Sequence, residues 1–432
     1  MMYAVVDCDN CFVSCERVFQ PELINRPVIV LSNNDGCVVA RSNEAKALGI
    51  KMGTPLYQIK EFCTTHHVHI RSSNYILYAD MSNRVMSILR DEVAPGQMEQ
   101  YSIDEAFLTL DDTFDYRAWG EALVAKIAKW TGMPVSIGIA PTRTLAKAAT
   151  WFAKRWKGYN KVCIIGNEEQ REKALKALPV EEVWGIGWRS QGKCNYHNIH
   201  TAWDLTQKSE SWIRNVFTIT GVRTWNELRG ISSITTVLTS DRQTICTSRS
   251  FEKMESELER LEMYVSNYAA HCAEKLRAQK SVCNMVTVFL QTNRFRDDLP
   301  QHDAGLTVSL LTPASSNHEI VQAALHALRA CYQKDYQYKR AGVIVSGVSP
   351  RTAIQQDLFD TLTPEQRNKL NLLSEVVDTI NQRMGRDTMI LGIQQFPNDQ
   401  QTGEALSFRD LIRHEYRSRC YTTNINELLE VK

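Results

Sequence analysis

The sequence lacks an excess of charge of either sign, because its 50 lysines and arginines balance 49 acidic residues to a formal net charge of +1. Overall charge therefore does not indicate a nucleic-acid partner, and any basic surface must be local. The sequence also lacks an apolar run of the ~18–20 residues that a membrane-spanning helix needs, so no membrane is expected. With 43% hydrophobic and 23% charged residues, extensive disorder is excluded, and 432 residues predict several globular domains.

A second Cys-x-x-Cys motif is also missing, so nothing completes a tetrahedral metal site around Cys8, Cys11 and Cys15. A thiolate metal site or a redox site is the minor alternative here, and small buried residues beside an active site are favoured. The twelve cysteines are scattered along the chain and no signal peptide is apparent. We therefore expect reduced thiols in a cytoplasmic protein.

Local positive charge is present in residues 141–161, which contain no acidic residue. The basic residues of this stretch are Arg143, Lys147, Lys154, Arg155, Lys157 and Lys161. Such a cluster is the kind of local basic surface that a nucleic-acid partner requires.

Two acidic patches interrupt short apolar runs that have strand character. Asp7 follows residues 3–6, and Asp104 with Glu105 lies inside residues 101–107. A buried carboxylate needs a charge partner, and divalent metal is the simplest way to hold three carboxylates together at strand ends. Oxygen ligands suit Mg²⁺, and two such ions form the clamp of in-line nucleotidyl transfer. The alternative is that each patch simply ends a strand with solvated turn acids.

Residues 1–110 alternate short apolar runs with helical stretches. Val28–Leu31 predicts a buried strand, and residues 97–110 predict a hairpin with the acidic pair near its turn. The remaining expected elements are helices at 41–49, 74–94, 116–131 and 142–156 and a strand at 135–139. Their order predicts an α+β sheet with helices on one face.

The composition shifts near Gly166. Residues 168–230 are expected to be mostly helical, and the Ser/Thr-rich residues 231–242 read as a linker. Residues 349–432 are polar, Gln-rich and less periodic, which is typical of a tail that docks to partners. Between them a second small α+β domain is expected, with a first strand from 244, helices at 252–279 and 318–332, and strands at 282–292, 306–311 and 341–347.

Gly185 and Gly187 lie between two helical stretches, in the pattern of a helix-hairpin-helix turn. Small residues let backbone N–H groups and a helix N-terminus approach a DNA phosphate without reading sequence. A plain helix C-cap explains a Gly-x-Gly about as well. Lys46 and Lys154 each lie on a predicted helix near the acidic patches, where a lysine would hold triphosphate oxygens as a point charge. A solvated lysine is the alternative for each of them.

Together these residues resemble the Y-family translesion DNA polymerases, and within them the UmuC-like group, the polymerase subunits of DNA polymerase V. The resemblance rests on Asp7, on residues 102–106 and on the glycine turn, and it covers essentially the whole chain. The longer stretches that carry it are 31–38, 44–49, 73–86, 184–187, 248–251 and 421–423.

The resemblance implies a right-hand polymerase fold. Its parts would be a palm with fingers at 1–165 (fingers about 22–75), a helical thumb at 166–240, a little finger at 244–348 and a C-terminal regulatory, clamp-binding region at 349–432. The implied enzyme is an error-prone DNA-directed DNA polymerase of the SOS response to DNA damage. It would add dNTPs to a primer 3′ end opposite damaged template.

The resemblance also implies roles for individual residues. Asp7, Asp104 and Glu105 would hold two Mg²⁺ ions, with the Cys8 carbonyl as a further ligand. The triphosphate would meet the main-chain N–H groups around Asn10, Cys11 and Phe12 together with the side chains of Lys46 and Lys154.

Phe12 falls at the steric gate of the family, where its ring would stack beneath the deoxyribose and collide with a 2′-hydroxyl. Cys11-Phe12 stands where the family commonly has Phe-Tyr, so the gate keeps its bulk but loses a hydroxyl above a smaller pocket floor. Ala40 and Asn43 stand where many relatives have a Thr and a Tyr that contact the triphosphate. UmuC-type chains share that difference, so it does not imply inactivity.

Residues 355–359 match the short peptide that bacterial polymerases insert into the sliding clamp. Leu358 and Phe359 would fill an apolar pocket while Gln355 binds its polar rim. A Leu-Phe pair that occurs by chance in a polar tail is the alternative. The resemblance further implies primer-template DNA, a UmuD′-type dimer and a RecA-type filament as partners, and a cytoplasmic, nucleoid-associated location.

Three other functions compete with this interpretation. A non-catalytic DNA-binding scaffold has no need to gather carboxylates. A palm-domain nucleotidyl cyclase has no use for the glycine turn, the little-finger-like domain or the clamp peptide. A nuclease would use the same metals, and incubation of labelled DNA without dNTPs would separate it from a polymerase.

Overall fold

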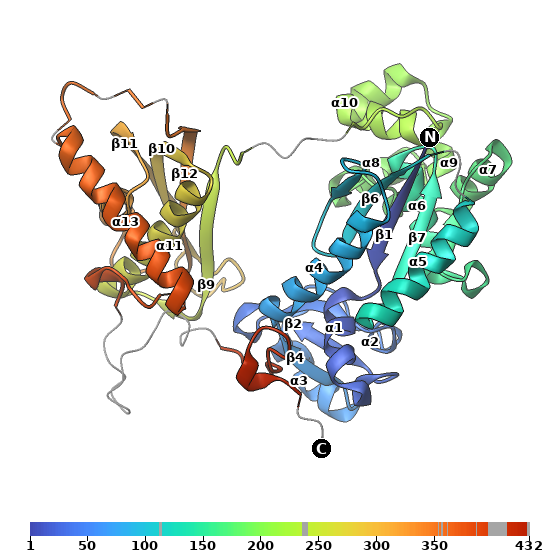
Figure 1. Ribbon diagram of the computed structural model, residues 1–432, viewed down its shortest axis with the longest axis horizontal. Coiled ribbons are helices and arrows are strands. Elements are labelled where there is room, and N and C mark those ends of the chain that lie inside the picture. The colour runs from blue at the N-terminus through green and yellow to red at the C-terminus, as the bar shows by residue number, and fades with distance from the viewer. Residues whose placement is uncertain are drawn as a thin grey trace. The chain divides into compact units, whose positions relative to one another are not determined.

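The computed structural model describes residues 1–111, 115–235, 241–352, 354–355, 357–360, 362–385, 387–395 and 413–429 (Figure 1). Residues 236–240 of the predicted linker and Gln356 of the clamp peptide lie outside the described residues. The chain forms two compact units, Met1–Val237 with His414–Lys432 and Leu238–Arg413, so it leaves the first unit, builds the second and returns. Among the described residues, no helix is long and apolar enough to cross a membrane.

The first unit is built on a five-stranded sheet in the order β5-β6-β1-β7-β8. The central strand β1 runs antiparallel to both β6 and β7, while β8 pairs parallel with β7. The bounds are β1 Met2–Cys8, β5 Met98–Gln100, β6 Glu105–Leu110, β7 Val135–Ala140 and β8 Val162–Ile164. The predicted hairpin is confirmed, with the acidic pair between β5 and β6 at the start of β6.

Helices cover both faces of this sheet, so the expectation of helices on one face was wrong. Ala4 and Val6 of β1 pack into one core, and Val5 packs into another. The first core takes in α1 (Cys11–Phe19), α4 (Tyr75–Asp91) and α5 (Tyr116–Thr131), and the second takes in α6 (Arg143–Arg155). Because β1 is apolar on both faces, each face needs its own helical cover.

A smaller sheet with the strand order β3-β2-β4 follows α1 along the chain. Its strands are β2 Val28–Leu31, β3 Val38–Arg41 and β4 His69–Ser72, and its helices are α2 Asn43–Ala47 and α3 Leu56–Thr65. The helix expected at 41–49 is shorter than predicted, because residue 41 pairs with Ile29 as part of β3. Ser42 then caps α2 by accepting a hydrogen bond from the Ala45 N–H at 3.2 Å.

Residues 168–230 are mostly helical, as predicted. The helices are α7 Glu168–Ala177, α8 Trp188–Tyr196, α9 Ala202–Thr206 and α10 Glu210–Leu228. Their apolar residues share one core with α6 and with the face of the sheet that carries Val5. The division between palm and thumb at residue 166 therefore crosses a continuous core, and it stays a prediction.

The second unit is a four-stranded sheet, β11-β10-β12-β9, covered by helices α11 and α12. The predicted order of elements is confirmed, but the first helix begins later than residue 252. Residues up to Glu255 extend β9 because they pair with β12 as far as Tyr338, and this pairing overrides local helix propensity. The bounds are β9 Ile245–Glu255, α11 Leu258–Ala278, β10 Ser281–Thr292, β11 Ala304–Ala314, α12 Asn317–Cys331 and β12 Tyr338–Pro350.

The region expected to be an aperiodic tail contains a 21-residue helix, α13 Pro364–Met384. Thr363 and Gln366 form a capping box at its start. Polar contacts attach it to the unit: Arg277 binds Asp378 at 2.6 Å, and Arg367 binds Glu319 at 3.0 Å. The apolar residues Leu370, Leu373, Val377 and Ile380 recur at helical spacing, so the sequence did carry a signal for this helix, and the expectation of an aperiodic tail was wrong here.

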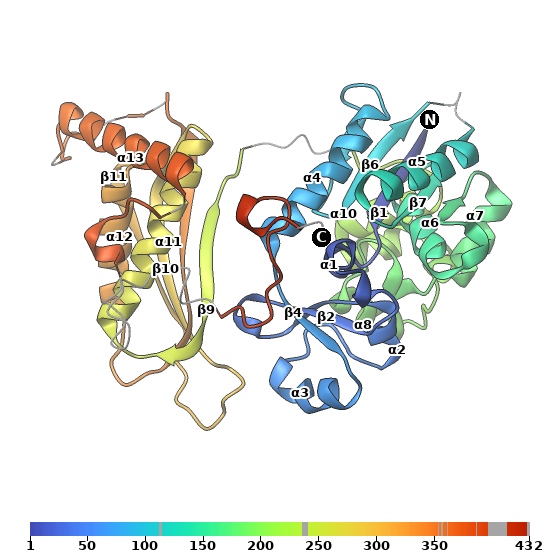
Figure 2. The same ribbon diagram turned by 60° about the horizontal axis from the view of Figure 1, so that its bottom comes forward.

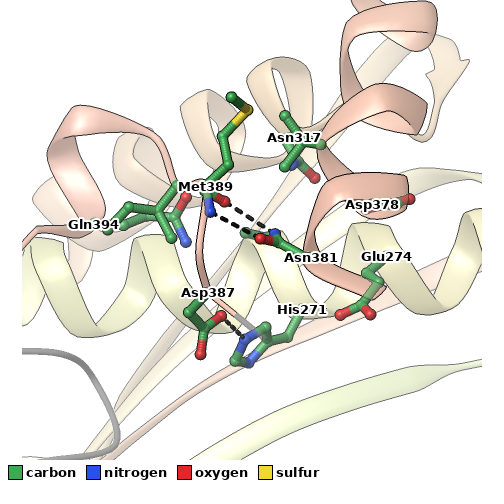
Figure 3. Close-up of a pocket in the computed structure, with 11 residues that line it drawn as sticks. His271, Glu274, Asn317, Asp378, Asn381, Asp387, Met389 and Gln394 are labelled. Atoms are coloured by element: carbon green, nitrogen blue, oxygen red, sulfur yellow. Dashed lines mark hydrogen bonds and ion pairs between the residues drawn. The ribbon is translucent and has the colours of Figure 1, made fainter. Parts of the chain in front are cut away.

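A small cavity of about 30 Å³ lies where the end of α13 and the segment after it meet α11 (Figure 3). His271 and Asp387 are 3.3 Å apart at one side of it. Asn381 accepts a hydrogen bond from the Met389 N–H at 2.8 Å and donates one to its carbonyl at 2.9 Å. A cavity of this size suits about one water molecule, so we interpret it as a gap between polar contacts that attach these segments and not as a ligand site.

Candidate active site

Asp7, Asp104 and Glu105 all lie near one end of the central sheet. Asp7 is directly opposite Glu105 in the antiparallel register of β1 and β6. The Cys8 N–H donates to the Asp104 carbonyl at 2.9 Å, which fixes the turn that carries Asp104. Residues opposite each other in a sheet have their side chains about 5 Å apart, so pairing of the two strands places these acids together.

Two lysines of α6 contact these carboxylates. Lys154 Nζ lies 2.5 Å from Asp7 Oδ1, and Lys147 Nζ lies 2.5 Å from Glu105 Oε1. Lys154 was predicted from the sequence to lie near the site, but Lys147 was noted only as part of the basic stretch. The seven-residue spacing of the two lysines, about two helical turns, was the signal that they share one face of α6.

Burial changes the protonation of this group. It raises the pKa of Asp7 to about 8, in spite of the neighbouring Lys154 ammonium, and Glu105 adds to the rise. Burial also raises the pKa of Asp104, although Ser102 donates a hydrogen bond to its carboxylate. For Glu105, burial is outweighed by the hydrogen bond with Asp7 and by Lys147, so its pKa is lowered. Burial therefore disfavours the charged forms of Asp7 and Asp104, which a cation bound at this site would stabilise.

The donor set fits a hard divalent cation, because the side chains of the buried Asp7 and the half-buried Asp104 and Glu105 offer only oxygen atoms. In the part of the chain that the structure describes, no three side chains of His, Cys, Asp or Glu are arranged to hold a metal ion. The carboxylate oxygens are instead occupied by Lys154, Lys147 and Ser102. Metal binding at this site would thus exchange lysine contacts for metal contacts.

A second group of polar residues lies at the start of α1. Asn10 has a left-handed backbone (φ 47°) and precedes the helix, so the N–H groups of Cys11 and Phe12 belong to its first turn. Lys46 Nζ donates to Asn10 Oδ1 at 2.6 Å, and Asn10 Nδ2 donates to Asn43 Oδ1 at 3.2 Å. The sequence-predicted Asn10 and Lys46 are thus brought together.

The surroundings of Lys46 favour an anion. Burial lowers the pKa of Lys46, and the nearby cations of Arg41, Lys154 and Arg155 lower it further. Asp9 raises the pKa of Lys46 again, but only in part. A helix N-terminus beside such a group of cations is a ready site for phosphate.

The ring of Phe12 packs against two tyrosine rings. Its ring stacks on Tyr78 with centroids 4.6 Å apart and an interplanar angle of 15°, and it meets Tyr75 edge-on at 5.7 Å. Both tyrosines come from α4. The position of the gate residue predicted from the sequence is therefore set by the helix beneath it.

Gly185 and Gly187 form a tight turn before α8. Gly185 has φ +98°, and a Cβ there would lie 2.7 Å from Thr224 Oγ1, so glycine is required. Gly187 is the N-cap of α8, and a Cβ on it would meet nothing within 4 Å. The stretch before the turn is a short 3-10 helix, Val180–Glu182, where the motif leads one to expect a longer helix.

Leu358 and Phe359 of the second unit are exposed, at 92% and 80% of their surface. Contacts on each side fix the backbone of this segment. The Asp357 N–H donates to Thr312 Oγ1 at 3.1 Å, and Asp360 binds Arg367 at 2.7 Å. The predicted clamp peptide, whose Gln355 is also exposed, thus displays two large apolar side chains on an anchored turn.

Asp9 is a residue that sequence reasoning gave no role. Its carboxylate accepts hydrogen bonds from Ser136 at 2.9 and 3.0 Å and pairs with Lys161 at 2.8 Å. It lies two residues after Asp7 and one residue beyond the end of β1 at Cys8. Strand alternation alone would place Asp9 on the same side as Asp7, so no signal in the sequence indicated that Asp9 pairs with Ser136 and Lys161 instead.

Comparison with known proteins places the chain in a family. A model described as the impB/mucB/samB family matches residues 6–151, its C-terminal domain matches residues 242–358, and a domain of unknown function (DUF4113) matches residues 371–431. The chain is 37% identical to protein ImpB of Salmonella typhimurium over 99% of both chains, and 38% identical to protein UmuC of the same species over 100% of both. The chain belongs to the impB/mucB/samB family.

Solved structures give the same fold. The chain matches a Y-family DNA polymerase chimera of Dbh and Dpo4 with a TM-score of 0.66 and 19% identity, over 81% of this chain and 100% of that one. An insertion ternary complex of Dbh DNA polymerase matches with a TM-score of 0.53 over the same shares. The predicted α+β polymerase fold, the UmuC-like Y-family relationship and the DNA-directed DNA polymerase class are confirmed.

Proposed function

We propose that this impB/mucB/samB family member adds dNTPs to a primer 3′ end opposite damaged template by two-metal nucleotidyl transfer, within the SOS response. The observation that carries the proposal is the pairing of Asp7 with Glu105 beside Asp104, at the same strand end as a cationic helix N-terminus. A metal-binding carboxylate group beside a phosphate site is what nucleotidyl transfer requires.

In this proposal Asp7, Asp104 and Glu105 hold two Mg²⁺ ions, and the Cys8 carbonyl is a further ligand. When bound, the ions would lower the pKa of the primer 3′-hydroxyl and neutralise charge on the phosphates. Lys154 has two alternative anionic partners, the Asp7 carboxylate that it contacts at 2.5 Å and a nucleotide phosphate. Its ammonium moves to phosphate when the carboxylate is otherwise neutralised.

The nucleotide lies, in the same proposal, over the start of α1. The N–H groups around Asn10, Cys11 and Phe12 donate to phosphate oxygens, and Lys46 neutralises the phosphate charge. A phosphate here would offset the burial and the neighbouring cations that lower the pKa of Lys46. Phe12 supports the sugar and excludes a 2′-hydroxyl by its bulk. Catalysis is then mostly positioning and electrostatics, with no covalent enzyme intermediate.

DNA is held by parts with separate tasks. Palm and fingers (1–165), thumb (166–240) and little finger (244–348) form the right hand, and Gly185 and Gly187 let the backbone N–H groups approach primer-template phosphates. Gln355, Leu358 and Phe359 bind the sliding clamp, and residues 349–432 act as a regulatory region. A UmuD′-type dimer and a RecA-type filament are the proposed partners, and the proposed location is cytoplasmic and nucleoid-associated.

Primer extension across an abasic site tests this proposal. The assay contains Mg²⁺, all four dNTPs and the sliding clamp, with and without UmuD′-type and RecA-type proteins, and Asp104→Ala serves as the inactive control. We expect the wild-type protein to extend the primer past the lesion and the Asp104→Ala variant not to do so. If DNA binds but no primer is extended on damaged or undamaged template, even with the partners, the scaffold function replaces this proposal. Shortening of labelled DNA without dNTPs would indicate a nuclease.

A further inference from the structure

The C-terminal strap, residues 414–424, lies along the first unit although it follows the second unit in the sequence. Figures 1 and 2 show this red segment beside β4 and the start of α4. The Ser72 N–H at the end of β4 donates to the Tyr416 carbonyl at 3.1 Å, and the Tyr416 N–H donates to Ser72 Oγ at 2.9 Å. The strap falls within the matched domain of unknown function, residues 371–431.

A buried asparagine anchors the middle of the strap. Asn74, the N-cap of α4, is only 1% exposed. Its Nδ2 donates to the Ser418 carbonyl at 3.2 Å, to Ser418 Oγ at 3.1 Å and to the Arg419 carbonyl at 3.1 Å. Since Asn74 Oδ1 also accepts from the Leu77 N–H at 3.4 Å, one side chain both caps α4 and holds the strap.

An aromatic stack fixes the end of the strap. Tyr421 stacks on Phe19 of α1 with centroids 4.8 Å apart and an interplanar angle of 9°. Gln20 donates to the Tyr421 hydroxyl at 3.1 Å, and Arg71 donates to Gln20 at 2.5 Å. Tyr416 packs against the core of the small sheet and Tyr421 against the core of the large one, so the strap joins the two.

A continuous set of contacts leads from the strap to Phe12. Ser418 Oγ donates to Glu16 Oε1 at 3.0 Å, and the Tyr78 hydroxyl donates to the same oxygen at 2.6 Å. Glu16 is fully buried, so its carboxylate depends on these donors. Phe12 stacks on the Tyr78 ring at 4.6 Å. Ser418 therefore lies two hydrogen bonds from the ring that supports the proposed sugar gate.

We propose that the C-terminal strap is a working part of the nucleotide pocket, in which Ser418 is a positioning residue that acts through Glu16 and Tyr78 to hold Phe12. This inference rests on the proposed function of Phe12 as the sugar gate. Loss of the Ser418 hydroxyl removes one of the donors to a buried carboxylate, which frees the Tyr78 ring to shift and loosens the gate. The strap thus helps to set the discrimination between deoxyribonucleotides and ribonucleotides.

The test compares kcat/KM for a ribonucleotide and its deoxyribonucleotide in single-nucleotide insertion by the full-length protein. Ser418→Ala and Tyr78→Phe should each raise the ribonucleotide preference by roughly threefold to tenfold, the worth of one hydrogen bond, mainly through KM. Ser418→Thr keeps a hydroxyl and should restore the wild-type ratio. Thr423→Ala, an exposed strap residue, is the matched control, and circular dichroism of each variant verifies folding.

Phe12→Ala distinguishes a failure of the sugar-gate role of Phe12 from a failure of the positioning role of the strap. If Phe12→Ala changes the ratio and neither Ser418→Ala nor Tyr78→Phe does, the gate stands and the role of the strap is overturned. If Phe12→Ala leaves the ratio unchanged, the gate itself is refuted and the strap has no pocket residue to position. A uniform fall in activity with an unchanged ratio in Ser418→Ala would reduce the strap to a structural attachment.

Discussion

Lys154 and Asp7 form a 2.5 Å ion pair where α6 passes the end of β1. Burial lowers the pKa of Lys154, but the nearby carboxylates, first that of Asp7, outweigh it and raise the pKa above its ordinary value. The chain therefore supplies its own cation to the carboxylate that is proposed to bind metal. Any divalent ion at this site must compete with an ammonium group that is already in place.

Asp104→Ala and Glu105→Ala should each reduce nucleotide incorporation by at least about a hundredfold, because each removes a proposed ligand of the metal ions that neutralise charge in the transition state. The fold and the affinity for primer-template DNA should change little. Single-turnover insertion in Mg²⁺ measures the first effect, and DNA titration measures the second. Asp91→Asn, at the exposed end of α4, is the matched control. Wild-type rates in either alanine variant would refute the metal assignment.

Lys46→Ala should raise the KM for dNTP by roughly tenfold and leave kcat less affected, since an ion-assisted hydrogen bond to phosphate is lost. The reason is that Lys46 is half-buried among the cations of Arg41, Lys154 and Arg155, whose charge a phosphate would offset. Steady-state insertion kinetics give the two constants, with the exposed Lys51→Ala as control. A KM equal to that of Lys51→Ala would remove Lys46 from the phosphate site.

Phe12→Ala should increase ribonucleotide insertion relative to deoxyribonucleotide insertion by roughly tenfold or more, the range expected when a pocket loses the bulk that rejects one group. The ratio of kcat/KM values for the two sugars is the measurement. Cys11→Ala provides a comparison at the neighbouring small residue of the pocket floor, where a smaller change is expected. An unaltered ratio in Phe12→Ala contradicts the gate.

Replacing both Leu358 and Phe359 with alanine should weaken clamp binding at least about tenfold, because two large exposed side chains are the expected hot spots. Distributive synthesis without the clamp should be unaffected. Titration of labelled clamp gives the affinity, and Leu372→Ala with Leu373→Ala, exposed on α13 in the same unit, is the control. Equal affinity in the two double variants would rule out this peptide as the contact.

Glu16→Gln should change how stability depends on pH. Burial raises the pKa of Glu16 in spite of hydrogen bonds from Tyr78 and Ser418. Because the folded state holds the Glu16 proton more tightly than the unfolded state, protonation adds to the free energy of unfolding. This contribution is fully present at pH values below the unfolded-state pKa, and it is lost as the pH rises through the folded-state pKa. The wild type should therefore lose more stability than Glu16→Gln between pH 5 and pH 8, as measured by urea unfolding. Curves that stay parallel, as expected for the exposed Glu22→Gln, would contradict this.

Local patterns predicted most elements of the first unit and the gathering of Asp7, Asp104 and Glu105, because strand alternation and a hairpin turn are short-range signals. Lys147 and Asp9 were given no role at the site, since their part depends on which face each presents after folding. The strap was missed for a related reason. Ser418 and Glu16 are 402 residues apart in the sequence, and polar residues of a tail give no periodic signal of a buried destination.

Because the chain returns to its first unit, the second unit is an insertion that is connected to the first unit at both of its ends. Docking of the strap closes a loop around it, and because loop-closure entropy grows only slowly with length, even a long loop is closed by modest contacts. One proteolytic cut within residues 231–242 should thus leave both pieces associated through the strap. Displacing the strap would leave the second unit attached at one end only and enlarge the volume that the proposed clamp peptide can search.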